Sequence, residues 1–452
     1  MSDFTPSRRG FLLGAAVLGV TAGAPAMASA APRPVAEATP MLEGILDFID
    51  VMTPWDGIAA LPQSYADQLG LFSTAFVYDS AVAICAAVSE GRLRLARRIG
   101  DGLLFAQDHD PQYTDGRLRQ AYNVRPYVFY DGSKNDYGLV LPDGTANIGW
   151  QFGFVGTAVG DMAWPGMALL HLHRVTHDSR YLDGARRIGT WIIDVATNPR
   201  SLGGFLFGVN AVDAVDPHVS TEHNIDCIAF FRMLEQADSD SDQRWRAARM
   251  RAQNLVDQMW EPNGGYFYTG SNDGDTINTS PLPLDPQTWG WLSMRDRHYA
   301  GALDWARSEL AVTDTPDAPN SQLPVGVTIS GVTFSSASKT STASYNEIPV
   351  DQHGVWLEGT AQLACALNDR HAPQDRARAV ALVQQIETAR THLGTGQTAG
   401  GTPVSGGVVA ASSLLDTGFY FGYFQVQHVG ASGWAVLAAN RTNPMWLGRL
   451  HA

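Results

Sequence analysis

Two kinds of hydrophobic pattern alternate along the chain. In the first kind, apolar residues recur every three to four positions with charged residues between them, which predicts amphipathic helices that pack on the outside of a fold. In the second kind nearly every position is apolar, which predicts helices buried on all sides. We expect amphipathic helices near residues 41–52, 92–107, 180–196, 242–260, 298–311 and 374–393, and buried helices near residues 79–89, 161–175, 222–236, 285–294, 358–368 and 430–440.

Six buried helices that alternate with six outer ones can close into a ring. The sequence therefore predicts an all-α fold, an (α/α)6 barrel with six inner and six outer helices. A helical solenoid has the same alternation, but its repeats of about 34 to 47 residues are shorter than the spacing of these buried helices. Long connections rich in Gly, Pro, Asn, Asp and aromatic residues lead into the buried helices, and loops this long are usually functional or disordered. We expect them to gather on one face and to wall a cleft.

The first 30 residues predict an export signal. Arg8 and Arg9 form a twin-arginine pair, an uncharged apolar run follows to about Pro25, and small residues at 26–30 are typical of a cleavage site. We therefore expect a signal peptide at residues 1–30, a single barrel domain at residues 31–452, and a periplasmic or extracellular protein. No later stretch approaches the roughly 18 apolar residues of a membrane span, so no membrane anchor is expected.

The composition argues against several classes of ligand and partner. The net charge is −14, and Lys134 and Lys339 are the only lysines, so the sequence has no phosphate-binding Gly-Lys loop. The dense basic runs lie on the predicted outer faces of amphipathic helices, so we expect no nucleic-acid partner. Cys85, Cys227 and Cys365 each lie in an apolar helical stretch, which predicts buried thiols without a disulfide framework. No spacing of ligands indicates a metal or another cofactor, and the sequence predicts no particular oligomeric state.

Acidic residues stand at the start of five of the six buried helices: Asp79, Asp161, Glu222, Asp285 and Glu358. Capping and the helix dipole alone would favour acidic residues there. In a closed ring, however, these carboxylates would converge on one rim, where mutual repulsion and burial push their pKa values apart, as an acid and base pair requires.

Two local sequences make particular carboxylates stand out. Glu222 lies in Ser-Thr-Glu-His-Asn-Ile-Asp, and Glu358 lies in Val-Trp-Leu-Glu-Gly-Thr-Ala-Gln, where Gly359 leaves room close to the backbone. We predict Glu222 and Glu358 as catalytic residues, with Asp79 and Asp285 as further candidates.

Aromatic and polar side chains near the same helix starts suggest a carbohydrate ligand, because sugar C–H groups stack on aromatic rings while hydroxyls bond to carboxylates and amides. An alternative for the tryptophans is that they fill a wide helical core. The predicted substrate-binding residues are Tyr78, Trp150, His223, Gln287, Trp289 and Trp356.

The six helix pairs, Tyr-Asp-Ser-Ala at 78–81 and Trp-Leu-Glu-Gly-Thr at 356–360 resemble the (α/α)6-barrel glycoside hydrolases. The resemblance implies hydrolysis of a glycosidic bond, often with inversion, by one protonated and one ionised carboxyl group. We expect an exported hydrolase of a poly- or oligosaccharide in which Glu222 protonates the leaving oxygen and Asp79 or Glu358 activates water.

Two other functions fit the same rim. One is a sugar epimerase or a polysaccharide lyase that uses His223, His353 or His428 with a tyrosine as proton carriers. The other is a carbohydrate-binding protein without catalysis.

Overall fold

Every stretch that the hydrophobic pattern predicts to be helical is helical in the computed structural model. It describes residues 38–448 except residues 56, 70, 130, 131, 150–152 and 240, so the predicted signal peptide lies outside the described residues. The inner helices are α2 (Val77–Ser89), α4 (Val159–Thr176), α6 (Thr221–Ala237), α8 (Asp285–Met294), α10 (Leu357–Arg370) and α12 (Val429–Ala439). The outer helices are α1 (Ala38–Met52), α3 (Leu93–Asp108), α5 (Ser179–Ala196), α7 (Asp242–Gln258), α9 (Gly301–Glu309) and α11 (Asp375–His392).

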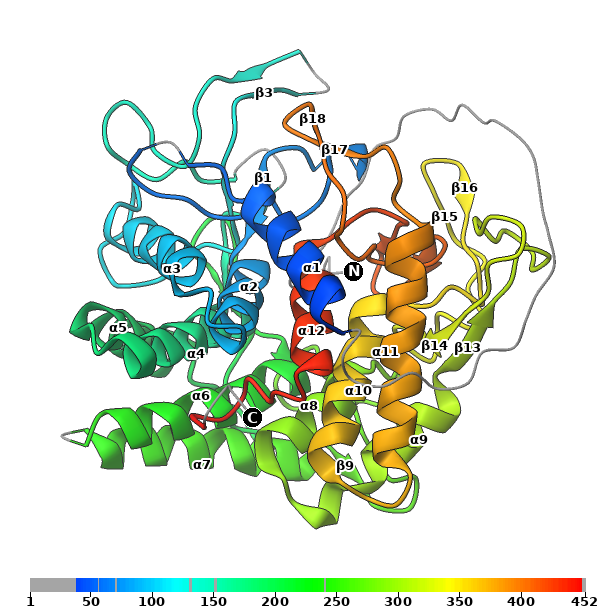
Figure 1. The fold of residues 1–452 in the computed structure, drawn as a ribbon. Helices are drawn as coiled ribbons and strands as arrows, with labels where there is room; N and C mark the ends of the chain where they lie inside the picture. The colour runs from blue at the N-terminus through cyan, green and yellow to red at the C-terminus, as the bar shows by residue number, and fades with distance from the viewer. Residues whose placement is uncertain are drawn as a thin grey trace.

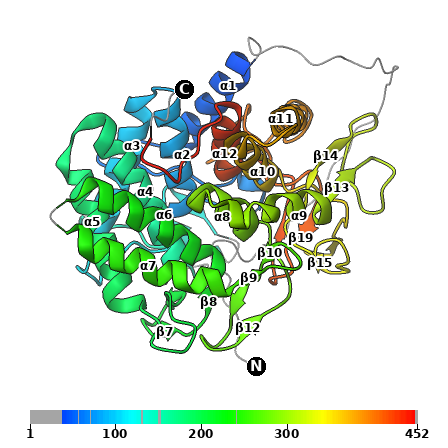
Figure 2. The same cartoon turned by 90° about the horizontal axis from the view of Figure 1, so that it is seen from below.

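The inner helices close into a ring. Each one packs on the next, and α12 packs on α2 to complete the circle. The outer helices lie against them, as the view along the ring in Figure 2 shows. The chain is therefore an (α/α)6 barrel, and the predicted fold class is confirmed. None of its described helices has the combination of length and hydrophobicity that crossing a membrane requires.

The long loops carry short antiparallel strands, several of which are visible above and beside the helices in Figure 1. The strands are β1 (Thr74–Phe76), β2 (Ala121–Asn123), β3 (Tyr127–Val128), β4 (Lys134–Asn135), β5 (Thr157–Ala158), β6 (Gly208–Val209), β7 (Val215–Asp216), β8 (Val219–Ser220), β9 (Trp260–Glu261), β10 (Tyr266–Phe267), β11 (Gly270–Ser271), β12 (Ile277–Asn278), β13 (Ala311–Asp314), β14 (Ile329–Val332), β15 (Ser344–Tyr345), β16 (Ile348–Pro349), β17 (Thr398–Ala399), β18 (Thr402–Pro403), β19 (Leu415–Asp416) and β20 (Gly422–Tyr423). They pair as β1–β2, β3–β4, β5–β6–β7, β8–β11–β12, β9–β10, β13–β14, β15–β16, β17–β18 and β19–β20.

One hydrogen bond recurs at the start of all six inner helices. The backbone N–H of the residue that opens the helix, or in α8 of the residue just before it, donates to a carbonyl in a loop that belongs to a neighbouring part of the ring. The bonds, with donor–acceptor distances of 2.8 to 3.1 Å, are Val77 to Gln120, Val159 to Phe207, Thr221 to Thr269, Leu284 to Phe334, Leu357 to Ala410, and Val429 to Ser64. We call this set the collar. It satisfies one of the N–H groups that a helix leaves unpaired at its start, and it joins the starts of all six inner helices to the loops around the rim.

Four aromatic rings fill the interior of the barrel below the collar. Tyr78 of α2, Trp164 of α4, Trp289 of α8 and Trp434 of α12 have neighbouring ring centroids 5.2 to 6.2 Å apart, and all four are buried. We call these four rings the aromatic plug. Trp164 and Trp289 thus fill a wide helical core, which was the alternative interpretation of the tryptophans.

Two buried carboxyl groups lie in the loop region between α9 and α10. Asp314 accepts hydrogen bonds from Ser321 Oγ at 2.6 Å, from Ser412 Oγ at 2.6 Å and from Ser413 Oγ at 2.7 Å. Burial raises the pKa of Asp351 from its ordinary value of 3.8 to about 6, and the nearby charge of Asp314 adds to the rise. The native state therefore keeps the proton on Asp351 to a higher pH than the unfolded chain does.

This pKa predicts a dependence of stability on pH that Asp351→Asn removes. Between pH 4 and 7 the native protein binds more protons at this site than the unfolded chain, so the free energy of unfolding falls as pH rises, by at most about 3 kcal/mol from this group. Denaturant unfolding of wild type and variant at pH 4 and pH 7.5 measures the effect. The variant should gain stability relative to wild type as pH rises, and a constant difference would contradict the assignment.

Candidate active site

A pocket of about 280 Å³ opens beside the starts of the inner helices, and three of the predicted carboxylates line it: Glu222, Asp285 and Glu358. Each comes one residue after the donor of a collar bond, which is Thr221, Leu284 or Leu357. These three side chains thus share one offset from the collar donor and line the same space.

Asp79 and Asp161 are also at helix starts, but they do not line this pocket. Each comes two residues after its collar donor, Val77 or Val159. One further residue turns a helical side chain by about 100°, since the helix has 3.6 residues per turn. Both carboxylates are almost fully buried.

Glu358 is held from below by the aromatic plug. Its Oε1 accepts a hydrogen bond from the Tyr78 hydroxyl at 2.6 Å and one from Gln362 Nε2 at 3.3 Å. Trp434 Nε1 donates in turn to the Tyr78 oxygen at 2.8 Å. The carboxylate is 1% exposed, so these donors fix its position in the pocket wall.

Asp79 and His428 form a buried pair behind Glu358. His428 Nδ1 accepts the Ala431 N–H at 3.2 Å, from which we infer that Nε2 carries the hydrogen and donates it to Asp79 Oδ1, also at 3.2 Å. His428 Nδ1 lies 3.6 Å from Glu358 Oε2, and the imidazole stacks on Tyr65 with centroids 4.2 Å apart. Asp79 is therefore bonded to His428 and does not itself line the pocket.

Glu222 differs from the other two pocket carboxylates in its exposure. It is half-buried, whereas Asp285 and Glu358 are buried. Ser220 Oγ accepts the His223 N–H at 3.3 Å and thereby caps α6, so the helix start does not depend on Glu222 for its cap. Glu222 is the carboxylate that solvent and a ligand reach most easily.

The rest of the pocket wall comes from the loops. Its aromatic part comprises Phe207, Phe334, Trp356, Phe419, Tyr420, Phe421 and Tyr423, and its polar part includes His218, Ser220, Ser271, Asn272 and Asn278. Of these, only Trp356 was among the predicted site residues. The dense aromatic run Phe-Tyr-Phe-Gly-Tyr-Phe at 419–424 is the sequence signal that could have located this wall.

The other predicted substrate-binding residues lie elsewhere. Trp150 falls outside the described residues. Trp289 belongs to the aromatic plug, and Tyr78 reaches the pocket only through Glu358. His223 is fully buried against Phe207, with ring centroids 4.8 Å apart.

Both the oxygen and the nitrogen of the Gln287 carboxamide are hydrogen-bonded to the backbone. Its Oε1 accepts the Phe267 N–H at 2.8 Å, and its Nε2 donates to the carbonyls of Phe267 at 2.9 Å and Pro283 at 3.1 Å. The side chain thus secures the loop around β10. We do not carry Gln287, His223 or Trp289 forward as substrate contacts.

The described residues show no metal-binding arrangement, since no three His, Cys, Asp or Glu side chains among them gather as possible ligands. The acidic segment 272–275 forms a turn, in which Asp273 Oδ1 accepts the N–H groups of Asp275 at 2.9 Å and Thr276 at 2.7 Å.

The space left by Gly359 is filled by protein. A Cβ at this position would lie 2.1 Å from Trp356 Cε3 and 2.5 Å from Leu284 Cδ2. The glycine therefore lets the Trp356 indole pack over the start of α10, and this side chain takes the room that the sequence predicted close to the backbone.

Gly359→Ala should displace Trp356 and cost about 1 to 3 kcal/mol of stability, because both neighbours are buried and cannot move freely. Thermal unfolding and tryptophan fluorescence measure the two effects. Gly301→Ala at the start of α9 is the control, since its nearest neighbour would be an ordinary contact at 3.7 Å. Equal stability of the two variants would contradict this packing.

The chain is similar to known proteins in structure but not in sequence. No protein-family model matches the chain, and no curated protein matches it. A glycosidase solved in complex with glucose has 12% identity and a TM-score of 0.57, and the match covers 90% of this chain and 97% of that one.

Two further solved structures are similar over most of their length. The cellobiose 2-epimerase from Bacillus thermoamylovorans has 13% identity and a TM-score of 0.56 over 89% of this chain and 98% of that one. A GH76 alpha-mannanase from Bacteroides thetaiotaomicron has 11% identity and a TM-score of 0.51 over 89% of this chain and 94% of that one. At these identities the likeness is one of fold: the chain shares its (α/α)6 barrel with a glycosidase, a mannanase and a sugar epimerase.

Proposed function

We propose that this chain is an exported glycoside hydrolase that cleaves a poly- or oligosaccharide by carboxylate acid and base catalysis. The observation that carries the proposal is the pocket itself, in which Glu222, Asp285 and Glu358 share one space with aromatic and amide side chains. Aromatic faces stack on sugar rings, and amides and hydroxyls bond to sugar hydroxyls. The glycosidase and mannanase that share the fold add support.

The roles of the two glutamates follow from their surroundings. Glu222 is the more accessible group and would protonate the oxygen that joins two sugar units. Glu358 receives hydrogen bonds from Tyr78 and Gln362, an arrangement suited to a carboxylate that takes a proton from an attacking water. A water placed between Glu358 and the sugar would give inversion of configuration, which is the outcome we expect. Asp285 lies on the inner helix between those of the two glutamates.

A sugar epimerase is the second candidate, and one observation favours it. Among the described residues that line the pocket, His218 is the one histidine, and its Nδ1 is hydrogen-bonded to Asp216 Oδ1. A histidine oriented in this way can carry a proton to or from a substrate carbon. The histidines named from the sequence are placed differently, since His223 and His428 are buried and His353 is half exposed beside Asp351.

A product assay separates the two candidates. The mature chain from residue 31 is incubated with a panel of plant and bacterial oligosaccharides, and products are followed by reducing-end detection and by chromatography of the intact oligosaccharides. New reducing ends support the hydrolase. A new isomer of unchanged length supports the epimerase, and substrate that binds without change supports a carbohydrate-binding protein.

Glu222→Gln and Glu358→Gln should each lower kcat by at least about a hundredfold, because general acid or base assistance is worth 10² to 10⁴ in rate. Stability should change by no more than about 1 kcal/mol, the usual worth of a charge at a helix start. The measurements are turnover on the substrate that the panel identifies and a melting curve for each variant.

Asp161→Asn is the matched control, since this carboxylate also begins an inner helix but does not line the pocket. It should keep its turnover. Full activity in both glutamine variants would exclude Glu222 and Glu358 and leave Asp285 as the pocket carboxylate to test.

Export is a separate part of the proposal and rests on Arg8 and Arg9. Replacing both with Lys should keep the precursor in the cytoplasm, because the twin-arginine route recognises the arginine pair. Fractionation of cells that express each form, with detection of the processed and unprocessed chain, measures the effect. Unchanged export of the double variant would refute this route.

A further inference from the structure

We propose that the pocket half formed by Phe207, His218, Asn272, Asn278 and Tyr420 is a leaving-group site that accepts a second sugar or a similar neutral, hydroxyl-rich unit. The inference rests on the proposed hydrolase function and specifies its substrate: a sugar linked to another polyhydroxyl unit rather than to an aromatic or alkyl group.

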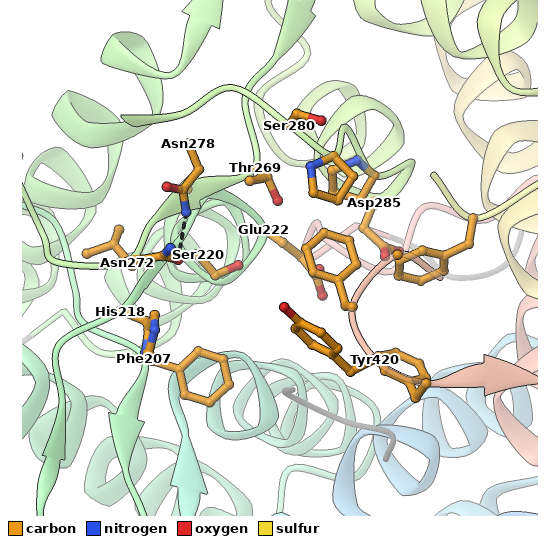
Figure 3. Close-up of a pocket in the computed structure, with 18 of the residues that line it drawn as sticks. Phe207, His218, Ser220, Glu222, Thr269, Asn272, Asn278, Ser280, Asp285 and Tyr420 are labelled. Atoms are coloured by element: carbon orange, nitrogen blue, oxygen red, sulfur yellow. Dashed lines mark hydrogen bonds between the residues drawn. The ribbon is translucent and has the colours of Figure 1, made fainter. Parts of the chain in front are cut away.

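Glu222 lies between two sides of the pocket. Figure 3 shows Phe207, His218, Asn272 and Asn278 on one side and Asp285 on the other, with Glu222 between them. The order of the ring agrees, since α8 packs between α6 and α10, so Asp285 and Glu358 lie on the same side of Glu222. A general acid acts on the oxygen between two units of the substrate. The unit that leaves would therefore occupy the side away from Asp285 and Glu358.

The chemistry of that side fits sugar hydroxyls. Asn278 Nδ2 donates to Asn272 Oδ1 at 2.8 Å, the bond drawn in Figure 3, which orients both carboxamides on strands and turns of the β8–β11–β12 sheet. His218 is fixed by Asp216 at one ring nitrogen and by its carbonyl, which accepts the Phe207 N–H at 2.7 Å. Oriented amides and an imidazole offer both donors and acceptors, as neutral hydroxyls require.

Charge argues against an anionic leaving group. None of the described residues that line the pocket is a lysine or an arginine, while Glu222, Asp285 and Glu358 are all acidic groups. A phosphate or a uronate in the leaving-group half would lie beside Glu222 and would find no cationic partner there. The neutral amide side of the pocket therefore suits an uncharged unit.

Tyr420 supplies the aromatic face. Its φ of +67° lies in the left-handed region, which is unusual for a bulky residue, and its side chain is 81% exposed. Figure 3 shows the ring extending into the pocket from its loop toward the side of Phe207 and His218. The exposed ring is accessible for stacking on a ligand.

The hairpin that carries Tyr420 is firmly anchored. Asp416 accepts hydrogen bonds from Ser341 Oγ and from the Tyr345 hydroxyl, each at 2.6 Å, and Ser335 Oγ donates to the Thr417 carbonyl at 2.7 Å. These bonds hold the base of the hairpin in place and thereby fix the position of the Tyr420 backbone at the pocket.

The test compares two kinds of substrate. The α- and β-fluorides of glucose, galactose and mannose have a leaving group too small to use the proposed site, whereas the disaccharides of the same sugars must use it. We expect the ratio of kcat/KM on the disaccharide to kcat/KM on the fluoride to fall at least about tenfold in Asn278→Ala and in Tyr420→Ala. Tyr420→Phe, which keeps the ring, should restore most of the ratio.

Tyr137→Ala is the control, because this exposed tyrosine does not line the pocket, and its ratio should equal that of wild type. Melting curves verify that each variant is folded. An unchanged ratio in both alanine variants would overturn the inference and leave the hydrolase function intact. Failure of wild type to hydrolyse any fluoride or disaccharide would instead overturn the hydrolase function, and the inference with it.

Discussion

The collar is the constraint on which the rest of the site depends. Six backbone hydrogen bonds join the starts of the inner helices to the loops around them and hold the rim of the barrel together. A difference of one residue then decides where a side chain goes. Glu222, Asp285 and Glu358 come one residue after the collar donor and line the pocket, whereas Asp79 and Asp161 come two residues after it and are buried outside it.

The aromatic plug gives the pocket a rigid base. A barrel of this width would enclose a void if its axis were lined by small side chains, and four large rings fill it instead. Tyr78 belongs to both structures, since its ring packs in the plug and its hydroxyl bonds to Glu358. The position of the carboxylate is thereby coupled to the packing of the core.

The pattern of apolar residues was sufficient to predict the twelve helices and their closure into a ring. A helix buried on one face shows a repeat of apolar positions, and a helix buried on all faces shows a continuous apolar run. The same pattern also located the five carboxylates at the helix starts. The collar left no such signal, since each of its bonds joins a helix start to a loop carbonyl that is distant in the sequence. The offset of a carboxylate from its helix start has to be counted from the collar donor. Because the sequence does not reveal that donor, it could not distinguish the buried Asp79 from Glu358 in the pocket. Gln287 and His223 were chosen for their chemistry alone. In the structure Gln287 is hydrogen-bonded to the Phe267 backbone, and His223 packs against the Phe207 ring.

The bond between Val429 and Ser64 has a consequence for biosynthesis. It joins the last inner helix to the loop after the first outer one, so the ring stays open until α12 has been synthesised. The hairpin that carries Tyr420 and the imidazole behind Glu358 also come from this late segment. A nascent chain still on the ribosome can form local helix pairs, but it has neither a closed barrel nor a finished pocket. The apolar flanks that α2 and α10 later present to α12 are uncovered throughout that interval, which makes the partly synthesised chain a natural client for chaperones.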